Sequence, residues 1–165
     1  MACSLVECAN YEEYIEALKE FVLETNCEEF YLCLCENWLG NALPATQAEP
    51  DPSTADACLI HGYTQRMLVP LSYYEGKFRC HEDFHVDQML PALYRQVDHM
   101  RCFYFVPLHF REHCLGYYAI CNTAFPMRSS LFHSWSLNLS NSMENIRRII
   151  YLDHAVQELD KLYAT

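Results

Sequence analysis

A short polar cluster, Cys80-His81-Glu82-Asp83-Phe84-His85, contains the residue types in this sequence that most resemble a metal site. Structural zinc takes four nitrogen or sulfur ligands, usually as two pairs at a recognisable spacing such as Cys-x-x-Cys. No second pair of that kind stands out in the sequence. We therefore interpret the cluster as polar residues at the end of a strand, and we predict no metal ligand and no cofactor.

The sequence also contains 10 cysteines, which raises the question of thiol chemistry. Cys33 and Cys35 alternate with apolar residues in one run, so both thiols fall on the same face of a strand and pack as small hydrophobic groups. A catalytic cysteine needs exposure and a nearby cation, and Cys80 beside Arg79 is the one candidate that meets this description. We predict no catalytic residue, and cysteines of this kind indicate a reducing, cytoplasmic compartment.

Charge is distributed unevenly along the chain. Residues 1–60 contain 12 acidic and one basic side chain, whereas residues 61–165 contain 10 of each. An acidic surface repels phosphate backbones and anionic lipids, so we expect no binding to nucleic acid or membranes. The sequence contains no apolar run of about 18 residues, the length that a membrane span needs.

The periodicity of apolar residues predicts the elements that position these side chains. Asn10 caps a helix that ends near Asn26, and residues 29–36 form a strand that is apolar on both faces. A long loop over 37–58 follows. Further elements are a hairpin with its turn at Glu75-Gly76, a helix over 86–98, a second hairpin that turns at Arg111-Glu112, and a long helix from Ser129. Pro107 predicts an edge position or a bulge.

This order of elements predicts a single α+β domain. We expect an antiparallel sheet of five or six strands, with the N-terminal and C-terminal helices packed together on one face. A ligand site, if one exists, would lie between the sheet and residues 37–98, where a long loop accompanies aromatic and cationic side chains. The candidate ligand-binding residues are Trp38, Tyr63, Arg66, His81, His85 and Tyr104.

The last helix changes its period toward the C-terminus. Apolar residues at intervals of 3, 4, 3 and 4 form a coiled-coil seam of about two heptads. These residues are Ile149, Leu152, Val156, Leu159 and Tyr163. The alternative is that the same stripe packs onto the sheet of its own chain. The helix continues to the end of the sequence with its seam open, so we expect a homodimer and a covalently linked output domain.

Two motifs, Val106-Pro107-Leu108-His109-Phe110 and Gly116-Tyr117-Tyr118-Ala119-Ile120, resemble the hairpin that precedes the final helix of a GAF domain. The run Leu159-Asp160-Lys161-Leu162-Tyr163 resembles the link between GAF-like domains and GGDEF (diguanylate cyclase) domains in bacterial signalling proteins. The sequence itself contains no Gly-Gly-Asp-Glu-Phe motif.

The resemblance implies a regulatory GAF-like domain over 1–148 and the start of a signalling helix over 149–165 that leads to a missing output domain. It also raises two alternatives. Cys80-His81 is similar to the pair that attaches bilin in phytochrome-like GAF domains, although the surrounding bilin pattern is not evident. A free-standing cysteine enzyme similar to methionine sulfoxide reductase of the GAF type is the other.

Overall fold

The computed structural model describes residues 5–39, 63–111, 113–124 and 129–164, apart from the side chains of His81, Glu82, Ser129 and Leu131. Within these residues the chain adopts the predicted α+β fold. Its antiparallel sheet has five strands in the order β3-β2-β1-β5-β4. The strands are β1 (Glu29–Cys35), β2 (Arg66–Tyr74), β3 (Lys77–His85), β4 (Phe103–Phe110) and β5 (His113–Cys121). The predicted loop over 37–58 lies mostly outside the described residues.

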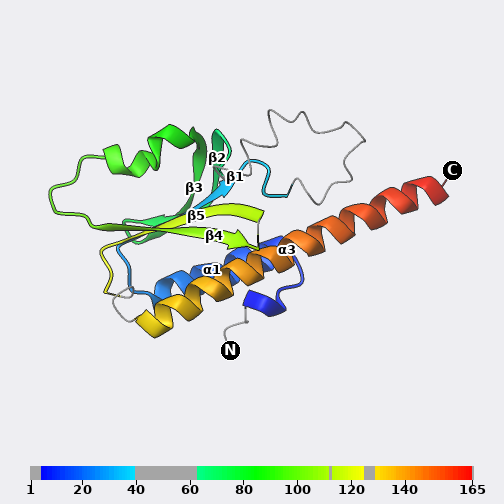
Figure 1. The fold of residues 1–165 in the computed structure, drawn as a ribbon, viewed down its shortest axis with the longest axis horizontal. Coiled ribbons are helices and arrows are strands. Elements are labelled where there is room, and N and C mark those ends of the chain that lie inside the picture. The colour runs from blue at the N-terminus through cyan, green and yellow to red at the C-terminus, as the bar shows by residue number, and fades with distance from the viewer. Residues whose placement is uncertain (1–4, 40–62, 112, 125–128, 165) are drawn as a thin grey trace.

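Two helices, α1 (Tyr11–Glu24) and α3 (Ser129–Tyr163), pack together on one face of the sheet, as predicted (Figure 1). The Asn10 side chain accepts a hydrogen bond from the Glu13 amide at 2.9 Å, which caps α1. The hydroxyls of Tyr14 and Ser142 lie 3.1 Å apart and join the two helices. A short 3-10 helix, η1 (Leu5–Glu7), precedes α1 and buries Leu5.

The central strand β1 is buried along its whole length, because elements cover both of its faces. Phe30 points to the helices, where its ring meets Trp135 edge-on with centroids 6.1 Å apart. Tyr31 points to the opposite face and stacks on Tyr74 at 6.2 Å. The run that is apolar on both faces in the sequence therefore corresponds to a strand with a core on each side.

The hairpin of β4 and β5 forms one edge of the sheet, with β4 outermost. Pro107 lies on this edge strand, where its missing N–H disturbs the ladder least. Leu108 pairs with Gly116 and His109 pairs with Cys114, so Leu115 is one extra residue in β5, a β-bulge. Gly116 has φ 144°, and a Cβ at this position would collide with the Cys33 carbonyl oxygen of β1.

Residues 86–101 cross the sheet face opposite the helices, and the predicted helix over 86–98 is wrong. Only two short 3-10 helices form there, η3 (Val86–Gln88) and η4 (Pro91–Tyr94). Met89 ends the first with φ 56°, a conformation that no right-handed helix accommodates. Leu90 is extended because it precedes Pro91, which disfavours the helical region for the residue before it.

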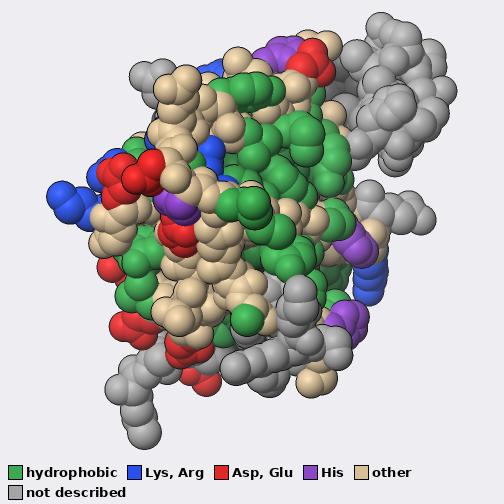
Figure 2. Space-filling view, turned by 90° about the vertical axis from the view of Figure 1, so that its left-hand side faces the viewer, with side chains coloured by type: hydrophobic (Ala, Val, Ile, Leu, Met, Phe, Trp, Pro, Cys, Tyr) green, Lys and Arg blue, Asp and Glu red, His purple; other side chains and the backbone are tan. Residues whose placement is uncertain are grey.

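The long helix α3 is buried in its N-terminal half and exposed in its C-terminal half. Trp135, Leu139, Met143 and Ile146 lie in the core, at the spacing that the sequence shows. Beyond them the helix extends past the end of the sheet (Figure 1). Hydrophobic side chains also gather on the face seen from the left-hand side of that view (Figure 2).

Candidate functional site

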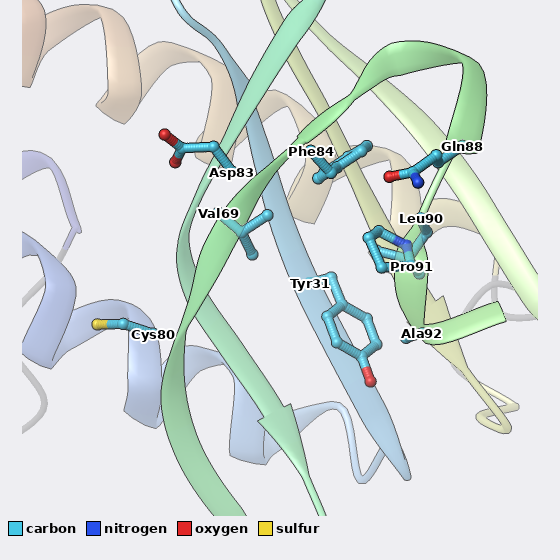
Figure 3. Close-up of a pocket in the computed structure, with 9 residues that line it drawn as sticks. All are labelled: Tyr31, Val69, Cys80, Asp83, Phe84, Gln88, Leu90, Pro91 and Ala92. Carbon is cyan, nitrogen blue, oxygen red and sulfur yellow. The ribbon is translucent and has the colours of Figure 1, made fainter. Parts of the chain in front are cut away.

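A cavity of about 520 Å³ lies between the sheet and the crossing segment. Strands β1, β2 and β3 form its floor, and residues 88–92 form its cover (Figure 3). Its lining residues are Tyr31, Val69, Cys80, Asp83, Phe84, Gln88, Leu90, Pro91 and Ala92. Figure 3 shows Tyr31, Leu90 and Pro91 near one another, while Cys80 and Asp83 lie apart from them at the far side of β3. The lining is therefore of mixed polarity, with the Gln88 amide beside Leu90.

The hydroxyl of Tyr31 belongs to a buried hydrogen-bond network. It donates to Glu29 Oε2 at 2.7 Å, and both residues lie on the same face of β1. Burial raises the pKa of the Tyr31 hydroxyl, and the neighbouring Glu29 carboxylate raises it further. Tyr31 therefore stays neutral and acts as a hydrogen-bond donor to Glu29, so it contributes shape to the cavity and no proton chemistry.

Glu29 fastens the cover to the sheet. Its carboxylate accepts hydrogen bonds from Arg95 Nη2 at 2.6 Å and from Arg101 Nη1 at 3.3 Å. Arg101 also donates to the carbonyl oxygens of Ala92 and Arg95, each at 2.9 Å, and so holds the cover in shape. Glu29 and Arg101 are both almost completely buried, which makes this ion pair the main polar anchor of the crossing segment.

The ionisable groups of the cavity are already engaged. The Asp83 carboxylate is paired with Arg66, which also contacts Glu36 at 3.2 Å. Together with the mixed lining, this arrangement suits the binding of a small molecule that has both apolar and hydrogen-bonding groups. A general acid or base would need a proton-bearing group aimed at the substrate, and Tyr31 and Asp83 are committed to other partners.

The cavity lies in the predicted region, between the sheet and residues 37–98, but other residues line it. Trp38 is buried and its ring lies 6.4 Å from that of Tyr11. The ring of Tyr63 meets that of Tyr117 edge-on at 5.4 Å.

The remaining predicted ligand residues also lie elsewhere. Arg66 is exposed in the ion pairs described above, His85 caps η3, and Tyr104 is half-buried on β4. The side chain of His81 lies outside the described residues. Tyr31, Val69 and Leu90 were not predicted as cavity residues, because in the sequence apolar residues look like ordinary core. The feature of the sequence that could have indicated the cavity is that β1 is apolar on both faces. One face packs on the helices, and the other lines the cavity.

The exposed part of α3 is a second candidate site. From Leu152 onward the predicted seam is exposed: Leu152 is 59% exposed, Val156 55%, Leu159 53% and Tyr163 87%. Ile149, at the start of the seam, is half-buried and packs against the core of its own chain. An apolar stripe of this kind on a projecting helix is typical of an interaction surface.

Cys80 is exposed, but the cation next to it in sequence is directed elsewhere. The Arg79 guanidinium lies 4.1 Å from the ring centroid of Tyr74 and 3.5 Å from the Glu75 carboxylate. Cys80 Sγ lies 3.7 Å from the Pro70 carbonyl oxygen. Cys80 was a candidate nucleophile because Arg79 is next to it in the sequence. In the structure the Arg79 guanidinium contacts Tyr74 and Glu75 instead of the Cys80 thiol.

None of the described helices combines the length and the apolar character that crossing a membrane requires. Comparison of the chain with family models, with curated proteins and with solved structures finds no match in any of the three.

Proposed function

We propose that this chain is a non-catalytic regulatory domain that forms a homodimer through α3 and passes a signal along that helix to a covalently linked output domain. The observation that carries the proposal is the exposed stripe on the projecting half of α3. Leu152, Val156 and Leu159 are each more than half exposed, whereas Leu139 on the same helix is fully buried. Burying each such side chain is worth about 1.5–3 kcal/mol, which favours pairing.

A second copy of the chain fits the stripe better than an unrelated partner. The 3-4 spacing keeps the same residues at the contact as two helices wind around each other, and a parallel copy presents an identical stripe. The charged residues Glu158 and Lys161, paired at 2.8 Å, are adjacent to the seam positions without occupying them. Two heptads are short for a coiled coil, so the folded domain must contribute to the dimer.

We assign the output to the diguanylate cyclase (GGDEF) class of bacterial signalling proteins, located in the cytoplasm. The support is the resemblance of Leu159–Tyr163 to the link that precedes such domains, and of the second hairpin to a GAF domain. In that class, two active sites meet across a dimer to join two GTP molecules into cyclic di-GMP. A rotation of the paired α3 helices would set whether they meet.

The cavity beneath residues 88–92 supports a sensing role. Its volume of about 520 Å³ is within the range of sites for small ligands, and its mixed lining favours a small molecule with both apolar and hydrogen-bonding groups. A ligand there would contact the crossing segment, which Glu29 ties to β1 through Arg95. Ligand binding would therefore act on the central strand of the sheet that supports α3.

Sedimentation equilibrium tests the dimer. The double variant Val156→Glu with Leu159→Glu places two charges in the stripe, and we expect a folded monomer where the unaltered chain is a dimer. The matched control, His154→Glu with Gln157→Glu, introduces two carboxylates at exposed positions outside the stripe and should leave the dimer intact. A stripe variant that stays dimeric, or that unfolds as a core variant would, contradicts the proposal.

A further inference from the structure

The outer side of β4 is an open edge of the sheet that carries no charge. Within the described residues no strand lies beyond β4. From Phe103 to Leu108 the strand contains no acidic or basic side chain. The opposite edge strand, β3, contains both kinds, such as Lys77 and Asp83. Charged side chains on an edge strand hinder pairing with another chain, so β4 lacks a protection that β3 has.

The side chains of β4 are apolar on both faces of the strand. Phe103 and Phe105 share one face, with ring centroids 6.2 Å apart, and Tyr104 and Val106 lie on the other. All four side chains are half-buried. A strand beside β4 would bury both sets further if it were itself apolar on both faces. The β4 strand of a second copy has this property, so two copies of β4 are complementary in their side chains.

The backbone groups of Phe103, Phe105 and Pro107 point to the open side of β4. Residues of an antiparallel pair alternate between those that bond to the neighbouring strand and those that point away from it. The Asn122 amide donates to the Cys102 carbonyl oxygen at 3.0 Å, so every second residue from Cys102 onward bonds toward β5. The register with β5 is regular over this stretch. Pro107 therefore belongs to the outward-pointing set, and it is the position in that set without an N–H.

We propose that Pro107 prevents the open edge of β4 from pairing with β4 of a second copy of the chain. In antiparallel pairing of two β4 strands about Phe105, each Phe103 lies opposite Pro107 of the other copy. The Phe103 amide can donate to the Pro107 carbonyl oxygen, but no N–H is present to donate to the Phe103 carbonyl oxygen. This acceptor would lose its water without gaining a hydrogen bond, at both ends of the paired segment. The missing donor therefore opposes a pairing that the side chains favour.

A residue with an N–H at position 107 would complete the hydrogen bonds between the paired strands. The sheets of two copies would then join edge to edge, as unprotected edge strands do. This role of Pro107 does not depend on the proposed dimer through α3 or on the output domain. It concerns the open edge of β4, which neither the cavity nor the α3 stripe uses.

Replacement of Pro107 by threonine tests the role of the missing N–H. Threonine supplies the N–H, suits a β-strand and adds no charge. The full chain also carries Val156→Glu and Leu159→Glu, so that α3 does not contribute to association. In sedimentation velocity we expect Pro107→Thr to give a species with at least twice the mass of this parent. The matched control is Pro70→Thr on the interior strand β2, which creates no donor at an open edge and should leave the mass unchanged.

Hydrogen exchange locates the new contact, since the Phe105 amide should become protected in the associated Pro107→Thr chain. A folded Pro107→Thr chain with the mass of its parent overturns the inference, and so does association that leaves the Phe105 amide unprotected. The unaltered chain gives a result even if the variant does not fold. Its outward-pointing Phe105 amide should exchange much faster than its Tyr104 amide. Equal protection of the two amides would mean that the edge is already covered, which also overturns the inference.

Discussion

The phenyl ring of Phe21 on α1 stacks on the indole ring of Trp135 on α3, with centroids 4.9 Å apart and planes inclined by 2°. Trp135 also meets the ring of Tyr118 on β5 at 5.1 Å. One side chain thus joins both helices to the sheet. The stacking fixes α3 close to its N-terminal end, so the projecting C-terminal half extends from a rigid base.

Replacement of Trp135 by alanine should destabilise the fold strongly. The substitution removes a large buried side chain and leaves a cavity between α1, α3 and β5, so we expect the free energy of unfolding to fall by about 3–5 kcal/mol. Urea denaturation followed by circular dichroism measures it. Leu137→Ala, at a position on the same helix that is 50% exposed, is the control and should change it by less than about 1 kcal/mol. Similar losses for the two variants would contradict the arrangement.

Gly116→Ala should be far more destabilising than Gly76→Ala. Both glycines have positive φ, 144° and 70°, but only at Gly116 does a new Cβ meet the backbone of a neighbouring strand. At Gly76 the surroundings are open, and the cost is the strain of the left-handed conformation, about 1–2 kcal/mol. Thermal unfolding of the two variants gives the comparison. An equal loss would mean that β1 and the β5 bulge are not in close contact.

Glu29→Gln should loosen the segment that covers the cavity. The change leaves Arg101, whose side chain is only 8% exposed, without its buried anion, at a cost of about 3–5 kcal/mol. Hydrogen exchange should show the greatest loss of protection over residues 86–101. Glu16→Gln, which breaks an exposed pair with Lys19, is the control and should cost less than about 1 kcal/mol. Unchanged exchange over 86–101 would show that Glu29 does not hold the cover.

The contact between His99 and Glu28 should make stability depend on pH. Hydrogen bonds to Asp98, and then to Glu28, raise the pKa of His99 above its ordinary value of 6.5. The contribution of protonated His99 to the free energy of unfolding is therefore complete below pH 6.5, and it is lost as the pH rises through the pKa of His99 in the folded protein. Asn122 and His99 lower the pKa of Glu28 from 4.5, so that contribution is present above pH 4.5 and is lost on acidification.

The stabilising effect of His99 should therefore be greatest between pH 4.5 and 6.5. The difference in melting temperature between the unaltered chain and His99→Gln measures it, and it should shrink on going from about pH 6 to about pH 9. A difference that stays constant over this range would mean that protonated His99 does not stabilise the fold.

The fold was largely predictable from the sequence because its elements carry strong local signals. The cap at Asn10, the run over 29–36 and the turn at Glu75-Gly76 each determine one element without distant information. The helix expected over 86–98 does not form, and both local backbone conformation and long-range contacts account for this. The backbone at Met89 is not helical. Arg95 and Arg101 contact Glu29, from which they are separated by 66 and 72 residues in the sequence.

The candidate site was less predictable than the fold. Polar and aromatic residues were chosen as ligand contacts, yet Tyr63 and Trp38 pack against other rings. Most of the residues that line the cavity are apolar, and alternation alone cannot distinguish them from core residues. The stripe on α3 was predictable because its apolar residues recur at intervals of 3 and 4 in the sequence. Its exposure was not predictable, because it depends on where the sheet ends.

Photo-crosslinking from within the stripe tests the central claim most directly. A benzoylphenylalanine at Leu159, in a mixture of ¹⁴N-labelled and ¹⁵N-labelled chains, reports which residues of another copy lie beside it. A parallel dimer predicts mixed-isotope crosslinks from position 159 to residues 156–163 of the second copy. Crosslinks confined to single chains, or crosslinks to another copy that fall near Leu152 as in an antiparallel pair, would contradict the account.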